Sequence, residues 1–184
     1  MEKWVVTAKK ADFQGIGRKY GIDPVIARII RNRDITGDEA IEEYLNGTLA
    51  DIPSWKLLKD IDKAVEIISG KIDAGTKMRI IGDYDIDGVT ATYILLKGFK
   101  RLGANVDTYI PDRVADGYGI HDHLIKKAME DGIDTIVTCD NGISASSQIT
   151  YAKELGMTVV VTDHHEVPFT DTEEGRTYIL PPAD

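Results

Sequence analysis

Short hydrophobic runs recur in the second half of the chain, and each of them ends in polar residues. The runs have the length and apolar character of buried strands, and they occupy Met78–Ile81, Val106–Ile110, Thr135–Cys139 and Thr158–Thr162. Longer stretches between them predict helices over Gly88–Leu102, His121–Glu130 and Ser144–Leu155. Strands that alternate with helices of this length indicate βαβ units, so the predicted fold class is α/β, a parallel sheet flanked by helices.

The part of the chain before residue 75 predicts helices without strands between them. Asp23-Pro24 precedes an apolar stretch over 25–31, and proline is favoured at the first position of a helix. A second helix is expected over 37–45. A third is expected over 61–72, with Asp60 as its candidate N-cap.

These patterns divide the chain into two parts. Residues 1–75 form a helical N-terminal segment without recognisable chemistry, and residues 76–184 form an α/β domain. The domain stops without a closing element, so we expect the chain to be a fragment of a longer protein.

Composition is typical of a soluble globular protein. Of the 184 residues, 42% are hydrophobic and 29% are charged. No apolar run approaches the roughly 20 residues of a membrane helix, and the N-terminus lacks the apolar core of a signal peptide. The one cysteine, Cys139, cannot form an intramolecular disulfide, and we expect a small buried residue on a strand. These features predict a cytoplasmic protein that does not enter a membrane.

The net charge of −9, taken alone, argues against nucleic acid as a partner. It arises from 22 basic and 31 acidic residues, and a nucleic-acid binder usually shows a basic face. Two considerations weaken this objection. Acidic residues around bound cations are largely neutralised, and an enzyme can carry its basic groove on a different domain.

The polar residues that end the hydrophobic runs are suited to metal binding. Asp83, Asp85 and Asp87 follow the first run, Asp140 follows the third, and an Asp-His-His triplet over 163–165 follows the fourth. Ligands of an open parallel sheet bind beyond the carboxyl ends of its strands, so we expect these side chains to share one edge. Carboxylates suit Mg²⁺ and Mn²⁺, and imidazole suits several transition metals. The pattern predicts a site for two ions, which Asp140 could bridge.

Each motif also has an ordinary explanation. The acidic loop could be a calcium loop similar to an EF-hand, although it lacks the distal glutamate, or a phosphoacceptor pocket. The triplet could be a polar turn, and Asp-Asn-Gly at 140–142 is favoured in turns for backbone reasons. Taken together, the motifs favour one shared site over three unrelated turns.

Two further residues, Arg113 and Tyr118, could contact a ligand. Arg113 follows the second run and precedes a glycine-containing loop with Tyr118. A guanidinium binds phosphate oxygens with two donors, and a tyrosine ring can stack on a base, although a surface arginine and a loop tyrosine explain these residues equally well. His121 and His123 lie two residues apart at a helix start, and we expect them to face different sides as surface residues.

Five stretches in this order resemble the DHH phosphoesterase superfamily, which is named after the Asp-His-His triplet. They are Gly82–Gly88, Ile110–Arg113 with Gly117–Gly119, Asp140–Gly142, Asp163–His165 and Leu180–Asp184. Within the superfamily, the chain is similar to bacterial exonucleases specific for single strands. The resemblance covers residue 78 to the end. Any one of these motifs alone would be weak evidence for the family, but five motifs in the same order are specific evidence.

The resemblance implies the metal ligands. Asp85 matches an acid that binds one ion, Asp87 an acid that binds the other, and Asp140 a carboxylate that bridges both. His164 matches a further ligand. Asp83 stands where other branches often have asparagine, so it is a candidate additional ligand.

The resemblance also implies residues that act on the substrate. His165 matches an imidazole that contacts phosphate, and Asp163 resembles a residue that orients its neighbours, so both are expected in the catalytic set. Arg113 and Tyr118 are expected to bind substrate with His165. Some branches carry a histidine ligand where this chain has Ile81, and a further acid lies downstream of Asp184. The fragment alone is therefore expected to bind metal weakly and to be inactive.

The implied function is a metal-dependent phosphodiesterase that degrades single-stranded DNA from the 5′ end in DNA repair and recombination. Two ions, Mn²⁺ or Mg²⁺, are expected, and mixed imidazole and carboxylate ligation favours Mn²⁺. Single-stranded DNA, a helicase and a single-strand-binding protein are the expected partners. Two alternatives stay open: a phosphodiesterase for oligonucleotides or cyclic dinucleotides, and a replication scaffold without catalysis.

Overall fold

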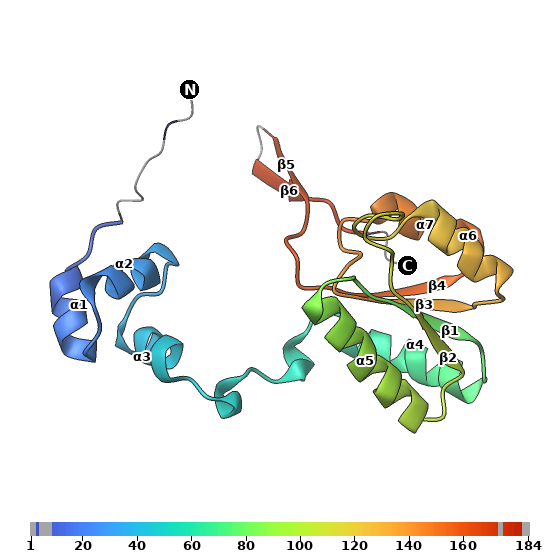
Figure 1. The fold of residues 1–184 in the computed structure, drawn as a ribbon, viewed down its shortest axis with the longest axis horizontal. Coiled ribbons are helices and arrows are strands. Elements are labelled where there is room, and N and C mark those ends of the chain that lie inside the picture. Colours follow the sequence, from blue (N-terminus) through green and yellow to red (C-terminus); the bar gives the residue numbers. More distant parts are fainter. Residues whose placement is uncertain (1–2, 4–8, 173–174, 182–184) are drawn as a thin grey trace. The chain divides into compact units, whose positions relative to one another are not determined.

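A four-stranded parallel sheet forms the centre of the second half of the chain (Figure 1). The computed structural model describes residues 3, 9–172 and 175–181. The strands are β1 (Met78–Ile81), β2 (Val106–Tyr109), β3 (Thr135–Cys139) and β4 (Thr158–Thr162), in the order β2-β1-β3-β4. All neighbouring strands are parallel, and Ile80 lies opposite Thr108 on one side and Val137 on the other. The predicted α/β fold is confirmed.

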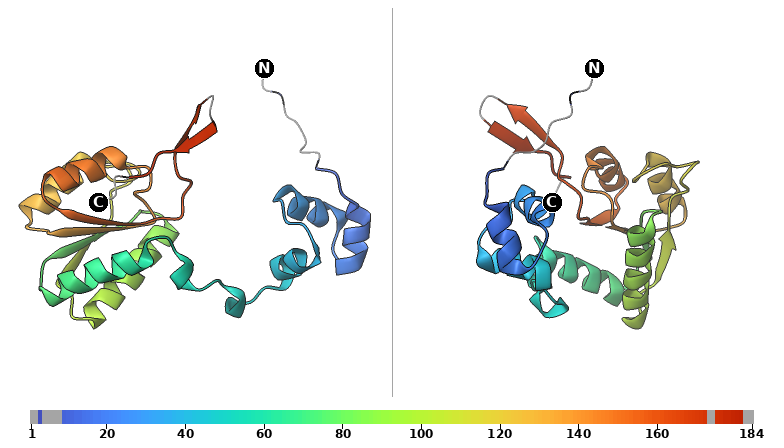
Figure 2. Two further views of the ribbon diagram at one scale, coloured as in Figure 1. Left: turned by 180° about the vertical axis from the view of Figure 1, so that it is seen from behind. Right: turned by 60° about the vertical axis from the view of Figure 1, so that its left-hand side comes forward.

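Helices cover both faces of the sheet (Figure 2). One face packs on α4 (Ile61–Asp73) and α5 (Ile86–Arg101), and the other packs on α6 (Asp122–Glu130) and α7 (Ser146–Glu154). Successive strand residues alternate between the faces, as Ile80 and Ile81 do, because strand side chains have a period of two. Cys139 is buried on β3, as expected, with its Sγ 3.3 Å from the Thr92 hydroxyl.

Three short helices lie in the N-terminal part: α1 (Phe13–Tyr20), α2 (Pro24–Asn32) and α3 (Asp38–Asn46). Helices α2 and α3 agree with the predicted helices, whereas α1 was not predicted. Two 3-10 turns follow, η1 (Leu49–Asp51) and η2 (Trp55–Leu57). The chain separates into two compact units, residues 1–58 and residues 59–184.

This division differs from the sequence-based boundary near residue 75, because α4 belongs to the unit that contains the sheet. Ala64, Ile67, Ile68 and Ile72 pack against the buried strand residues. Without this helix, part of one sheet face would be exposed to solvent. Asp60 is the N-cap of α4, as predicted, but it adopts a left-handed backbone (φ 56°) and makes no side-chain cap hydrogen bond.

A two-stranded antiparallel hairpin follows the central sheet, and it was not predicted. It consists of β5 (Phe169–Thr172) and β6 (Gly175–Tyr178). Of the terminal Leu180–Asp184 motif, the last three residues lie outside the described part of the chain. Among the described residues, no helix has both the length and the apolar character needed to cross a membrane.

Candidate metal centre

Strand order places the three polar motifs side by side. From β1 the chain crosses over to β2 on one side of the sheet, and β3 and β4 then follow on the other side. The loops that leave β1 and β3 therefore diverge, and this is where open α/β sheets bind ligands. The acidic loop, Asp140 and the Asp-His-His triplet follow β1, β3 and β4, which are adjacent strands.

The acidic loop begins helix α5. Asp85 is its N-cap and accepts a hydrogen bond from the backbone N–H of Gly88 at 3.1 Å. This hydrogen bond is the main reason why the pKa of Asp85 is lowered. Gly88 allows the loop to pack this tightly, because a Cβ there would lie 2.7 Å from the Cβ of Asp83. Asp87 lies in the first turn, where the helix dipole favours negative charge.

Asp83 is the buried member of the loop. It is 1% exposed, and its Oδ1 has no hydrogen-bond partner within the described part of the chain. A buried carboxylate oxygen without a donor is costly, so such an atom needs a specific explanation. A bound cation would provide the missing partner.

Asp140 follows β3 in a backbone conformation that non-glycine residues seldom adopt, with φ at 60°. Its neighbour Asn141 holds this turn in place, donating from Nδ2 to the carbonyls of Ile81 and Cys139, each at 3.3 Å. The ends of β1 and β3 are thereby tied together. Burial, followed by the negative charge of Asp87, raises the pKa of Asp140.

Asp163 fixes the orientation of the two histidines that follow it. Its Oδ2 accepts the backbone N–H of Ile143 at 2.9 Å, and its Oδ1 accepts the N–H groups of His164 and His165 and lies 2.7 Å from Nδ1 of His165. Burial alone would raise the pKa of Asp163, but these donors outweigh it and lower the pKa. The side chain is only 2% exposed, so Asp163 acts through its neighbours.

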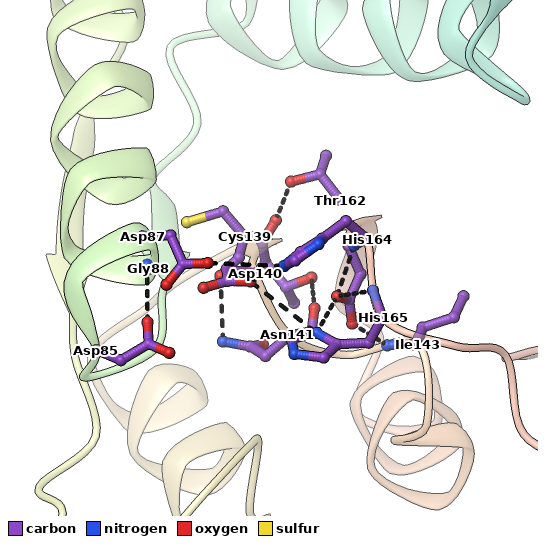
Figure 3. Close-up of polar contacts among 12 residues, drawn as sticks. Asp85, Asp87, Gly88, Cys139, Asp140, Asn141, Ile143, Thr162, His164 and His165 are labelled. Carbon is purple, nitrogen blue, oxygen red and sulfur yellow. Dashed lines mark hydrogen bonds and ion pairs between the residues drawn. The ribbon is translucent and has the colours of Figure 1, made fainter. Parts of the chain in front are cut away.

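The imidazoles and carboxylates converge on Asp140. Nε2 of His164 lies 2.8 Å from Asp140 Oδ1 and 3.8 Å from Asp87 Oδ2 (Figure 3). Nδ1 of His165 lies 3.9 Å from Asp140 Oδ1. Two groups of possible ligands, each with its atoms within 4.8 Å of one another, share Asp140: they are Asp83, Asp85 and Asp140, and Asp140, His164 and His165.

A series of contacting side chains, from Arg113 through Tyr84 and Tyr118 to His165, borders this cluster. The guanidinium of Arg113 lies 4.6 Å from the ring centroid of Tyr84, and Tyr84 meets Tyr118 edge to face at 6.4 Å. The Tyr118 hydroxyl lies 3.0 Å from Nε2 of His165. Burial and then the charges of nearby aspartates, Asp163 first, raise the pKa of Tyr118 to about 12, so the phenol stays protonated.

A model of the N-terminal domain of the DHH family matches residues 77–184. The match covers more than half of the chain, and it includes all the residues of the cluster. The chain belongs to the DHH family.

Curated DHH-family relatives share a substantial part of this sequence. The single-stranded-DNA-specific exonuclease RecJ of Salmonella typhimurium is 37% identical over 145 residues, which is 78% of this chain and 24% of that protein. RecJ of Bacillus subtilis is 33% identical over 180 residues, or 97% of this chain and 23% of that protein. The chain thus spans about a quarter of the length of these relatives.

Solved structures of DHH-family exonucleases have a similar fold. A crystal structure of exonuclease RecJ bound to manganese matches with a TM-score of 0.58 and 36% identity, over 62% of this chain and 30% of that one. RecJ of Thermus thermophilus in complex with Mn²⁺ matches with a TM-score of 0.55 and 28% identity, over 84% of this chain and 21% of that one. The family model matches from residue 77, whereas the compact unit starts at residue 59, so α4 precedes the region that the family model matches.

Two features of this DHH domain depart from the sequence analysis. The expectation that His121 and His123 face different sides is wrong: their rings are stacked, with centroids 5.8 Å apart. His121 precedes helix α6 and has an extended backbone, so helical spacing does not apply to it. Nε2 of His123 lies 2.8 Å from Asp116. The contributions of Tyr84 and Asn141 were missed, and only their places inside two predicted motifs pointed to them.

Proposed function

We propose that this chain is the metal-binding catalytic part of an exonuclease that hydrolyses single-stranded DNA from the 5′ end. The observation that carries the proposal is the sharing of Asp140 between two groups of possible ligands. A carboxylate shared in this way suits a pair of cations, and paired cations serve phosphodiester hydrolysis. The DHH-family relatives named as exonucleases specific for single-stranded DNA support the choice of substrate.

The residues present fit two divalent cations. We assign Asp85 to one cation, Asp87 and His164 to the other, and Asp140 to both. The unpartnered Oδ1 of Asp83 makes this residue an additional candidate ligand on the Asp85 side. Mixed imidazole and carboxylate donors favour Mn²⁺ over Mg²⁺, and the matched RecJ crystal structures contain manganese.

Cations at these positions would supply an activated water and offset the negative charge that develops on the phosphate. The chain's own residues would hold the substrate. The pKa of His165 is raised, chiefly by its hydrogen bond to Asp163, which favours a charged imidazole that would attract a phosphate group. Arg113 offers a second donor group, and its stacking on Tyr84 limits the positions that its guanidinium can take.

The wider role follows from the substrate. A nuclease that acts on single strands needs a reaction that separates duplex DNA, so we propose a helicase and a single-strand-binding protein as partners. We also propose that the enzyme acts in the cytoplasm, in DNA repair and recombination.

The test is hydrolysis of 5′-labelled single-stranded DNA by the purified full-length protein with Mn²⁺. The Asp140→Asn variant should lose activity by about a thousandfold, because a shared ligand supplies several kcal/mol of transition-state stabilisation. Asp73→Asn is the matched control, since Asp73 is an exposed aspartate at the end of α4. Undiminished hydrolysis by Asp140→Asn would refute the assignment, and preferred turnover of dinucleotides would refute the proposed substrate.

A further inference from the structure

The negative charge of the protein is confined to one of its two units. Residues 59–184 contain 13 basic and 22 acidic residues, which is the whole net charge of −9, while residues 1–58 contain nine of each. Within the N-terminal unit, residues 9–33 contain seven basic and two acidic residues. An anionic polymer would therefore be repelled by the unit that contains the sheet and attracted to this segment.

Both acidic residues of the basic segment are committed to the backbone. Asp12 accepts from the N–H of Gly15, and Asp23 accepts from the N–H of Val25, each at 2.8 Å. The two carboxylates cap α1 and α2, where the helix dipoles offset part of their charge.

Helices α1 and α2 form a closely packed pair joined by the three residues 21–23. Gly21 has a left-handed backbone (φ 66°), which glycine adopts without strain. Gly17 is buried between the helices, and a Cβ there would lie 2.8 Å from the carbonyl oxygen of Ile22. The pair is therefore a defined platform for the side chains that it carries.

Four exposed cations in or next to these two helices have no carboxylate partner among the described residues. Lys9, Lys19 and Arg31 lie within 4 Å of Asp34 or Asp38. The other four form no ion pair with a carboxylate in the part of the chain that the structure describes, and they are Lys10, Arg18, Arg28 and Arg33. Unpaired surface cations remain available to bind phosphate groups.

A depression of about 550 Å³ lies where the two helices begin, and it has the size of a small-ligand site. Phe13, Val25 and Arg28 line it. The guanidinium of Arg28 lies 4.8 Å from the ring centroid of Phe13, and Val25 is 63% exposed. An aromatic ring beside a guanidinium is the combination on which unpaired bases stack.

We propose that helices α1 and α2 form a second binding surface for single-stranded DNA, separate from the metal centre. A base would stack in the depression at Phe13 and Arg28, and the unpaired cations would bind the phosphates. This inference rests on the proposed function. It assigns the binding of the DNA strand to a basic surface of a protein whose net charge is negative. Stacking requires an unpaired base, which is why a single strand is the expected occupant.

Fluorescence anisotropy of the full chain with a labelled 20-nucleotide oligothymidylate tests this proposal. EDTA is present throughout, so that binding is measured without hydrolysis. The double variant Arg28→Ala/Arg33→Ala should weaken binding about tenfold or more, and the slope of log affinity against log salt should fall by roughly one to two. Phe13→Leu should weaken binding about tenfold while the salt slope stays unchanged.

The matched control is Lys100→Ala/Arg101→Ala, which removes two exposed cations from the end of α5. It should bind like the wild type. Unchanged affinity of the α2 double variant, an equal loss in the control, or tighter binding of duplex DNA would each overturn the proposal. If the chain binds the oligothymidylate as expected but the full-length protein does not hydrolyse single-stranded DNA, only the proposed function is contradicted.

Discussion

The two ends of the central sheet each carry a cluster of charged side chains, and the clusters differ in how their charges are balanced. At the amino end, Arg79 on β1 contacts Asp107 on β2 and Asp131 after α6. At the carboxyl end, three aspartates and two histidines gather around Asp140. The same sheet thus supports one cluster whose charges are paired and one in which acidic groups are in excess.

The cluster at the amino end is fully paired. Arg79 binds both oxygens of Asp107, at 2.7 and 2.8 Å, and one oxygen of Asp131 at 2.9 Å. Lys77 and Lys127 lie within 4 Å of these carboxylates. The guanidinium lowers the pKa of Asp131, because it stabilises the charged carboxylate. Because each carboxylate of this cluster is paired with a protein cation, the cluster stabilises the fold and offers no free carboxylate to a metal ion.

The cluster at the carboxyl end has an excess of acid. In the described part of the chain, no lysine or arginine forms an ion pair with Asp83, Asp85, Asp87 or Asp140. The guanidinium of Arg113 lies over the ring of Tyr84, and its charge helps to lower the pKa of Asp85, after the hydrogen bond from Gly88. An excess of carboxylates that repel one another is typical of sites for external cations. The difference teaches that the balance of charge distinguishes a structural cluster from a candidate cation site.

The largest effect on stability is expected at the amino end. Arg79→Met would leave two aspartates without their main partner, so the free energy of unfolding should fall by about 3 kcal/mol, as for other broken buried pairs. Urea denaturation followed by circular dichroism measures this change. Asp107 and Asp131 are about one-third exposed and can regain water, which limits the loss. A loss no larger than that of Lys126→Met on the exposed surface of α6 would contradict the structural role.

Added Mn²⁺ should stabilise the protein through the carboxyl end only. A cation at 100 times its dissociation constant stabilises the folded state by about 2.7 kcal/mol. The wild type and Arg79→Met should both gain this stability, whereas Asp140→Asn should gain little. In EDTA, Asp140→Asn should be as stable as the wild type or up to about 1 kcal/mol more stable, because one repelling charge is gone. Equal Mn²⁺ gains in all three proteins would refute a site at Asp140.

A smaller effect is expected from Tyr118→Phe. The variant keeps the ring beside Tyr84 but removes the hydroxyl that lies 3.0 Å from His165. The hydrogen bond is worth about 1 kcal/mol, so kcat should fall by up to about tenfold while KM changes little. Steady-state kinetics on single-stranded DNA separate the two constants. A change in KM alone would show that Tyr118 binds the strand and does not position His165.

The smallest effects concern pH, and they should have opposite signs at the two ends. The pKa of Asp131 is lowered in the folded state, so its stabilisation is present above the ordinary aspartate pKa and is lost as pH falls below it. The pKa of Asp140 is raised, so its charge destabilises the apo protein above that pKa, and protonation relieves this cost as pH falls.

Urea unfolding in EDTA between pH 3 and pH 7, a range that spans roughly the titration of aspartate, checks both signs. Asp131→Asn should lose less stability on acidification than the wild type, and Asp140→Asn should lose more. Parallel pH profiles for the two variants would contradict the proposed difference between the ends of the sheet.

Local pattern was sufficient to predict most of the second unit. The bounds of β3 and β4 agree with the predicted runs, because length and apolar character are properties of neighbouring residues. The polar residues that follow these strands could therefore be identified from the sequence alone. The hairpin β5–β6 escaped prediction, since its strands are four residues long and their described side chains are mostly exposed.

By itself, the sequence determined the strands of the central sheet, most of the helices, and the polar residues that follow each strand, because these depend on residues adjacent in the chain. Only the tertiary structure decided that β1, β3 and β4 are neighbours, that His164 reaches Asp140, and that Arg113 stacks on Tyr84. The tertiary structure also shows that α4 belongs to the unit that contains the sheet and that the rings of His121 and His123 are stacked. Contacts between distant residues follow from how apolar faces are buried together, and spacing along the chain does not encode those distances.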